Sequence, residues 1–328
     1  MKKKQKCTDN RCLYLIEDKN QLKKNFSTLA TKTREGKGLW EKCNICGLSI
    51  NRTGIQKNIS KKYYNTSYQK NNSLQSGQIL SPKSHFEIRK PGAKKIADKL
   101  SHYLNSSMSI YELGTGTGEL LFYLRNKVKY CEGNEINKAY SSFIKKDLRI
   151  NCNAKNFLKE NLKDRFDMII SISAIDHIHE TRKILEKIYS DLKNGGLFYL
   201  ELPNDYQILN KYLKPAFSNS FSKFMYQKAH YYSFTFDTII ALLKDIGFKI
   251  QNKESRQEYT LKNFLNWYFS KKPQSSFDEA TSPSKILNNF DDDLEKSINN
   301  LFKNFEDQFN KIVNENEVGD TICILAKK

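Results

Sequence analysis

Residues 110–119, with the sequence IYELGTGTGE, decide the fold of this chain. A short apolar segment carries the acidic residue Glu112, and Gly114, Gly116 and Gly118 then alternate through the turn into a helical segment. Glycine suits such a turn because the backbone bends sharply and approaches a ligand closely. The pattern predicts a strand, a ligand-binding loop and a helix, with N–H groups at the helix start free to bind the ligand.

A second acidic residue strengthens this interpretation. Glu135 directly follows the next strand-like segment, residues 129–134, about twenty residues after the glycines. A carboxylate there can accept hydrogen bonds from both hydroxyls of a ribose. The spacing predicts a nucleoside-containing cofactor and leaves the choice between nicotinamide and other nucleoside cofactors open. A turn that needs glycine for packing alone is the structural alternative.

Working outward, strand-like and helical segments alternate along the chain. Strands are predicted at residues 109–113, 129–134, 149–153, 167–173, 196–202 and 248–251, and helices at 119–127, 138–146, 181–192 and 236–246. This order predicts an α/β, Rossmann-like, doubly wound and mostly parallel sheet with helices on both faces. We further expect a helix after Pro91, a helical insert over about 258–316, and a last strand, 320–326, at the sheet edge.

These residues resemble the class I S-adenosylmethionine (SAM)-dependent methyltransferases, whose first motif has the form acidic-x-Gly-x-Gly-x-Gly. Segments similar to later motifs of that family occur at 165–171, 174–178 and 192–196. The resemblance implies that Glu112 and the glycine loop face the methionine portion of SAM and that Glu135 holds its ribose. The same architecture would also suit an NAD(P)-dependent enzyme or a catalytically silent SAM-binding subunit, and these alternatives stay open.

Further segments resemble a methyltransferase subgroup that is often encoded with polysaccharide or secondary-metabolite genes. They lie at residues 202–204, 230–235 and 257–273, although Phe264 stands where that group usually has histidine. The resemblance implies O- or C-methylation of a small molecule, such as a nucleotide-linked sugar or glycan intermediate. The fourth strand lacks the Asn/Asp-Pro-Pro-aromatic motif of amino-methylating relatives, which argues against adenine N-methylation.

Two histidines are candidate catalytic bases. The sulfonium of SAM carries its own leaving group, so the protein mainly aligns an acceptor and removes a proton. Histidine suits that proton transfer near neutral pH. His177 follows the fourth predicted strand, and His230 precedes the helix at 236–246. The alternative for His177 is packing or hydrogen bonding over the cofactor.

Four of the seven cysteines lie near the amino end. Cys43 and Cys46 form a Cys-x-x-Cys pair, and Cys7 and Cys12 lie upstream. Two such pairs can hold one structural Zn²⁺ tetrahedrally. Zinc-ribbon modules also precede the catalytic domain in relatives of the resembled kind, and the sequence CNICGL is similar to their second knuckle. A redox pair or a degenerate site is the alternative; the redox role is disfavoured because no thioredoxin-like pattern surrounds the pair.

The net charge of +19 does not identify a partner, because the lysines are spread along the whole chain. Tyr63, Tyr64 and Tyr68 beside Lys61 and Lys62 could stack on RNA bases, so an RNA-binding protein or RNA methyltransferase is a second hypothesis. We favour a lid over the cofactor for this stretch, and we do not expect nucleic acid as the partner.

We expect three regions. Residues 1–60 would be a zinc-ribbon-like module, 61–84 a linker or lid, and 85–328 the methyltransferase domain. No run of about 18 apolar residues occurs and the amino end is polar, so the sequence predicts a cytoplasmic protein without membrane insertion.

Overall fold

A seven-stranded sheet forms the centre of the computed structural model, which describes residues 26–33, 36–44, 46–53, 79–213, 220–282, 286–287 and 291–328. Its strands are β4 (Ser109–Leu113), β5 (Tyr130–Asn134), β6 (Asn151–Asn153), β7 (Phe166–Ile172), β8 (Leu192–Pro203), β10 (Lys249–Arg256) and β11 (Thr321–Lys327). They lie in the order β10-β11-β8-β7-β4-β5-β6. The strands from β8 to β6 pair in parallel, whereas β11 is antiparallel to both of its neighbours.

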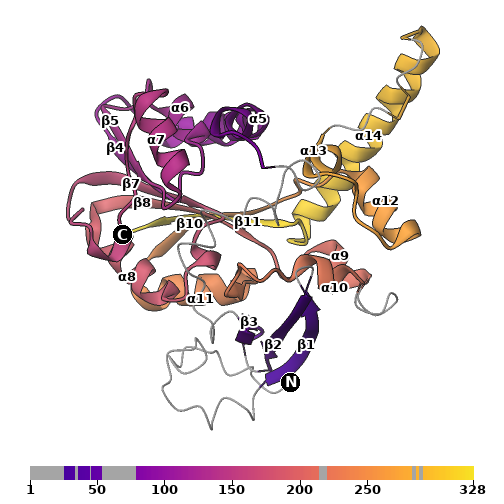
Figure 1. Ribbon diagram of the computed structural model, residues 1–328, viewed down its shortest axis with the longest axis horizontal. Helices are drawn as coiled ribbons and strands as arrows, with labels where there is room; N and C mark the ends of the chain where they lie inside the picture. Colours follow the sequence, from indigo (N-terminus) through magenta and orange to yellow (C-terminus); the bar gives the residue numbers. More distant parts are fainter. Residues whose placement is uncertain are drawn as a thin grey trace.

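Helices cover both faces of this sheet (Figure 1). One face carries α5 (Pro82–Leu100), α6 (Glu119–Leu124) and α7 (Lys138–Lys146), and the other carries α8 (Thr181–Asp191) and α11 (Phe236–Ile246). Adjacent residues of a strand point to opposite faces, so Ile110 packs into the core beneath α5 and α6, and Tyr111 packs into the core on the α8 side. This arrangement confirms the predicted α/β, Rossmann-like fold class.

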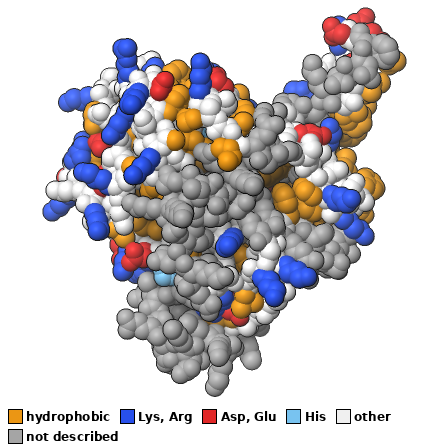
Figure 2. Space-filling view, in the orientation of Figure 1, with side chains coloured by type: hydrophobic (Ala, Val, Ile, Leu, Met, Phe, Trp, Pro, Cys, Tyr) orange, Lys and Arg blue, Asp and Glu red, His pale blue; other side chains and the backbone are white. Residues whose placement is uncertain are grey.

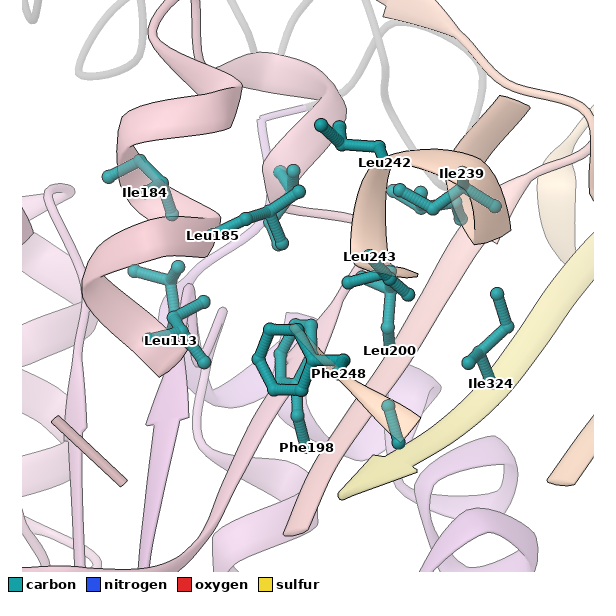
Figure 3. Close-up of a cluster of buried hydrophobic side chains, with 14 of the residues drawn as sticks. Leu113, Ile184, Leu185, Phe198, Leu200, Ile239, Leu242, Leu243, Phe248 and Ile324 are labelled. Carbon is teal, nitrogen blue, oxygen red and sulfur yellow. The ribbon is translucent and has the colours of Figure 1, made fainter. Parts of the chain in front are cut away.

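Buried hydrophobic side chains form the core on the α8 and α11 side (Figure 3). Leu185 of α8 and Leu243 of α11 meet Leu200 of β8 and Phe248, and all four are at most 3% exposed. Full burial of each such side chain stabilises the fold by about 1.5–3 kcal/mol relative to leaving it exposed. The cluster therefore fixes both helices on the sheet and thereby the loops that precede and follow them.

Two boundary predictions are corrected. The helix expected after Pro91 begins at Pro82, because the Ser81 hydroxyl accepts a hydrogen bond from the Ser84 N–H (3.0 Å) and proline suits the first helical turn. Pro91 lies inside this helix on its exposed side. The last strand, β11, does not form the sheet edge but lies between β8 and β10. Its first six residues are all buried, as expected for an interior strand.

The range predicted as a helical insert, about 258–316, contains three helices in its described part. It contains α12 (Leu261–Ser270), α13 (Phe277–Thr281) and α14 (Asp293–Glu315), and α14 projects away from the body of the molecule (Figure 1). Two short helices, α9 (Ile208–Tyr212) and α10 (Ser220–Met225), lie between β8 and the segment that leads to α11.

A second, smaller sheet joins the amino-terminal segment to the rest of the chain. β1 (Phe26–Thr33), β2 (Gly36–Cys43) and β3 (Ser49–Asn51) pair antiparallel, and β3 also pairs with β9 (Tyr232–Ser233). Trp40 of β2 stacks on Tyr226 with ring centroids 4.8 Å apart. The small sheet thus combines three strands from the predicted module at 1–60 with one strand from the predicted domain at 85–328. That last strand, β9, begins two residues after His230.

The described surface carries its positive charge in many places. Lysine and arginine side chains are scattered over the face shown in Figure 2, while apolar side chains gather toward α12 and α14. Within the described ranges, no helix combines the length and apolar composition that a membrane crossing requires.

Candidate functional site

The glycine loop follows β4 at the point where the order of the strands reverses. β5 and β6 continue on one side of β4, and β7 and β8 lie on the other, so the loops after β4 and β7 face each other across a crevice. Gly114 has a left-handed φ of 76°, and a Cβ there would come within 2.6 Å of the Ala174 Cβ. Glycine is therefore required for this close approach of the two loops.

Gly116 is a different case. Its φ is +57°, but a Cβ would find no atom closer than 3.7 Å, which is the Glu119 carboxylate. Its N–H donates to Glu135 Oε2 (3.1 Å). The N–H groups of Gly114, Thr115 and Gly118 are also bonded, to carbonyls of Asn134 or Thr115. The turn therefore satisfies the N–H donors of these four loop residues. The prediction of free N–H groups concerns the start of the next helix, at Glu119.

Glu112 is the most unusual group of the loop. Its side chain is 3% exposed, and its Oε2 has no hydrogen-bond partner among the described residues. Burial, with the nearby charges of Glu119 and Glu135, raises the pKa of Glu112 well above its usual value. A buried carboxylate oxygen without a donor is costly. A cationic or hydrogen-bond-donating ligand would remove that cost.

Glu135 lies directly after β5, as predicted, and faces the loop. Its Oε1 accepts a hydrogen bond from the Asn137 N–H (2.7 Å) while Oε2 accepts from Gly116. Burial raises its pKa to about 7. Each carboxylate oxygen has a second lone pair, so Glu135 can still accept the two hydroxyls of a ribose.

His177 and His230 come together although 53 positions of the sequence separate them. His177 ends η5 (Ile175–His177), which follows β7, and the two imidazole rings lie 4.4 Å apart, nearly perpendicular at 79°. Between them, the Asp176 carboxylate lies 3.8 Å from His177 Nε2 and 3.6 Å from His230 Nε2. The structure thus brings the two candidate histidines together and adds Asp176 to the group.

One cavity of about 1480 Å³ is lined by Glu112, Gly114, Gly116, Glu135, His177 and His230, whereas Gly118 and Asp176 are not part of its lining. The glycine loop and Glu135 form one part of its wall, and His177 and His230 form another. Glu201 and Arg256, from β8 and β10, also line it and form an ion pair with each other. The cavity is large enough for a cofactor and an acceptor side by side.

Sequence reasoning missed His85 of α5. Its Nδ1 lies 3.3 Å from the Thr117 hydroxyl oxygen, and its side chain lines the cavity. Burial, together with the positive charge of Arg89, lowers its pKa to about 4, so this imidazole is neutral at physiological pH. The signal was available in the Ser81-Pro82 helix start, which places residue 85 on the first turns of a helix that reaches the loop.

The structure describes two of the four cysteines of the predicted zinc site, which stays a prediction. Cys43 ends β2, Cys46 lies in the following turn, and the Leu48 N–H donates to Cys46 Sγ (3.5 Å). Cys7 and Cys12 lie outside the described residues. Among the residues that are described, the group suited to holding a metal ion is instead Asp176, His177 and His230.

Comparison with known proteins gives a family. Residues 84–253, just over half of the chain, match the model of a family described as a methyltransferase domain. A curated relative, (S)-coclaurine N-methyltransferase of Papaver somniferum, is 27% identical over 107 residues, which cover 30% of this chain and 30% of the relative. The chain thus matches less than a third of that protein.

Two solved structures show distant likenesses to this chain. A SAM-dependent methyltransferase from Archaeoglobus fulgidus shares 17% identity with a TM-score of 0.45, covering 74% of this chain and 99% of that one. A chain in the complex of the Haloferax volcanii Trm112 methyltransferase activator with a putative methyltransferase shares 12% with a TM-score of 0.49, covering 75% and 95%. On the family match, this chain belongs to the methyltransferase-domain family of SAM-dependent enzymes.

Proposed function

We propose that this chain transfers the methyl group of SAM to a small molecule bound in the cavity. The observation that carries the proposal is the Glu112 carboxylate, which is buried beside the glycine loop with one oxygen unpartnered. The ammonium group of the methionine portion of SAM would donate to that oxygen and would stabilise the ionised carboxylate. Family membership favours SAM over NAD(P) as the cofactor.

Glu135 would hold the ribose of the same cofactor. It lies across the loop from Glu112, on the neighbouring strand, and the hydrogen bond from Gly116 fixes its orientation. The loop would therefore lie along the cofactor while Glu112 binds its methionine end and Glu135 binds its central ribose. SAM supplies a methyl group on a positively charged sulfur, so the protein needs to align the acceptor and to accept its proton.

His177 and His230 are the proposed proton acceptors. Both line the cavity, with side chains only 12% and 14% exposed. An imidazole in this position could remove a proton from a hydroxyl or carbon acceptor as the methyl group is transferred. The charge of Asp176 would stabilise the protonated ring.

For the acceptor, we propose a nucleotide-linked sugar or glycan intermediate, on the resemblance of residues 202–204 and 230–235 to the polysaccharide subgroup. An amine is the second candidate, because the poppy relative is named for N-methylation of coclaurine. Incubation with methyl-labelled SAM and separate sets of nucleotide sugars and secondary amines distinguishes them. Label transfer to the sugars supports the first candidate, and transfer to the amines alone overturns it.

We also propose a structural Zn²⁺ held by Cys7, Cys12, Cys43 and Cys46. It is supported by the turn after β2, where the Gly47 N–H donates to the Cys43 carbonyl (2.9 Å) and the Leu48 N–H donates to Cys46 Sγ. The Leu48 N–H, which donates to the sulfur, would stabilise Cys46 as a thiolate ligand. Zinc content should fall by about one ion per chain in Cys46→Ser and should be unchanged in Cys131→Ser. An equal zinc content in both variants would rule this site out.

Calorimetric titration with S-adenosylhomocysteine tests the cofactor site. Glu135→Ala should weaken binding at least about tenfold, because two hydroxyl partners lose their acceptor. Glu132→Ala is the matched control: it removes a glutamate from the same strand whose carboxylate accepts from Tyr130 and Arg165 and does not line the cavity. Equal binding by the two variants would contradict the proposed role of Glu135.

A further inference from the structure

The Asp176 carboxylate has no partner that explains its burial. Its side chain is 1% exposed, and neither Oδ1 nor Oδ2 has a hydrogen-bond partner among the described residues. Burying an ionised carboxylate without hydrogen bonds is strongly unfavourable unless a positive charge compensates it. The groups beside it that can compensate its charge are the imidazoles of His177 and His230.

The distances do not fit hydrogen bonds. The two histidine Nε2 atoms lie 3.8 and 3.6 Å from Asp176 Oδ2, beyond the 2.7–3.2 Å of an N–H···O bond. They are closer to the spacing of two ligands of one metal ion. Two donor atoms at about 2.0–2.2 Å from a tetrahedral Zn²⁺ lie about 3.3–3.6 Å from each other. The three donor atoms of this group all lie within 4.8 Å of one another.

The backbone holds the three residues in place before any ion binds. The Tyr231 N–H donates to the Asp176 carbonyl (2.8 Å), which ties the segment before β9 to η5. The Asn51 side-chain amide donates to the His230 carbonyl (2.8 Å), so the small amino-terminal sheet also positions that histidine. Because the rings are nearly perpendicular, they approach a shared point from different directions.

We propose that Asp176, His177 and His230 form a binding site for a divalent transition metal ion of the zinc type. Two imidazole nitrogens and one carboxylate suit Zn²⁺, Fe²⁺ or Co²⁺, whereas Mg²⁺ and Ca²⁺ prefer sites made of oxygens. Three protein ligands leave a coordination position open, and both histidines line the cavity. An open position is typical of catalytic metal sites, whereas a structural four-cysteine site has all its positions filled by protein ligands.

The consequence for chemistry rests on the proposed function. An acceptor hydroxyl on the open position loses its proton to solvent more readily, because the cation stabilises the alkoxide. The oxygen then attacks the methyl carbon of SAM, the carbon–sulfur bond breaks, and S-adenosylhomocysteine leaves. In this metal-bound state both Nε2 atoms are ligands, so the histidines serve as proton acceptors only in the metal-free chain.

Co²⁺, which reports its ligands by visible absorption, tests the site. The full chain is freed of metal with a chelator and titrated with Co²⁺ in the Cys43→Ser/Cys46→Ser background, which removes the sulfur-to-metal bands of the cysteine site. We expect one remaining Co²⁺ site, with affinity lowered about a hundredfold or more in Asp176→Asn and in His230→Gln. His179→Ala, two residues from His177 and outside the group of three, should bind Co²⁺ as the background does.

Absence of this Co²⁺ site, or an affinity that Asp176→Asn and His230→Gln leave unchanged, would overturn the proposal. The two variants remove different ligands, so a folding defect in one leaves the other as a test; circular dichroism identifies such a defect. Titration of the same proteins with S-adenosylhomocysteine separates the two hypotheses. Cofactor binding without Co²⁺ binding defeats the metal site alone, and Co²⁺ binding without cofactor binding defeats the proposed methyl transfer.

Discussion

At the scale of single residues, the proposed cofactor site contains two carboxylates that lower the stability of the ligand-free fold and would bind the cofactor. Glu112 and Glu135 are carboxylates in a wall where water is largely excluded, and burial raises the pKa of both. Such groups destabilise the ligand-free fold when they are ionised. Both carboxylates lie where they could accept hydrogen bonds from a ligand that carries an ammonium group and hydroxyls.

The pH dependence of stability should reveal this cost. The folded pKa of Glu135, about 7, exceeds the reference value of 4.5, so between these values the folded protein binds more protons than the unfolded chain. The free energy of unfolding therefore falls as the pH rises through this window. Because Glu135 is partly exposed to the cavity, we expect Glu135→Gln to gain about 1–2 kcal/mol over the parent between pH 5 and pH 8. Urea unfolding without ligand measures this gain; a difference that does not vary with pH would contradict it.

Asn51 is a second residue whose loss should be informative. It is 1% exposed, and its amide donates to the carbonyls of Gln227, Lys228 and His230. Asn51→Ala should lower the free energy of unfolding by about 1–3 kcal/mol, because buried carbonyls lose their donor. Asn266→Ala, which removes one exposed hydrogen bond to Lys272, should cost under about 0.5 kcal/mol. Equal losses in urea unfolding would show that Asn51 does not secure this segment.

The residues proposed to bind the cofactor can be chosen from the sequence. Of the group around the histidines, the sequence indicates His177 and His230 but not Asp176. Glu112, the glycines and Glu135 follow from local motifs, because a strand, a tight turn and the next strand fix their positions. The proximity of Asp176 and His230 depends on a backbone hydrogen bond between distant segments, and Asn51 reaches His230 from the amino-terminal sheet. Such long-range contacts leave no periodic pattern in a single sequence.

At the scale of elements, β11 shows what a pattern can and cannot predict. Its apolar run identifies a strand, and six consecutive buried residues agree with an interior position. Its partners, β8 and β10, are not encoded locally, because pairing depends on how the chain returns after α14. The start of α5 differs from the prediction for another reason: Pro91 suggests a helix boundary, but Ser81 provides the cap, and the helix begins at Pro82.

Because β11 lies inside the sheet, its side chains should be important for stability. Ile324 is 1% exposed and belongs to the core on the α8 and α11 side. Ile324→Ala should lower the free energy of unfolding by about 2–4 kcal/mol, since a buried cavity replaces the side chain. Ile312→Ala on α14, where the side chain is 61% exposed, is the matched control with an expected change under about 0.5 kcal/mol. A small loss for Ile324→Ala in urea unfolding would place β11 at a weakly packed edge.

At the scale of the whole molecule, the amino-terminal sheet and the large sheet share contacts that should make them unfold together. Asp205 is 2% exposed and accepts hydrogen bonds from Ser49 of β3 and from Tyr226, at 2.9 and 3.0 Å. Through the first of these contacts β3 is attached to the segment that follows β8.

The two tryptophans of the chain report on the two parts separately. Trp40 lies in β2 and Trp267 in α12. We expect Trp40→Phe and Trp267→Phe, each followed by the fluorescence of the remaining tryptophan, to show transitions that coincide with circular dichroism of the same variant. An early transition of Trp40 alone would show that the amino-terminal sheet unfolds independently.

The central claim is that the glycine loop binds SAM, and one titration tests it most directly. Calorimetry with S-adenosylhomocysteine should show micromolar-range binding by the intact chain and none by Gly116→Arg, whose side chain would enter the cavity. Gly36→Arg is the matched control, because Gly36 also has a positive φ, with open space around it, and lies outside the cavity. It should bind as the intact chain does. No binding by the intact chain, or equal binding by Gly116→Arg, would contradict the assignment of this loop to SAM.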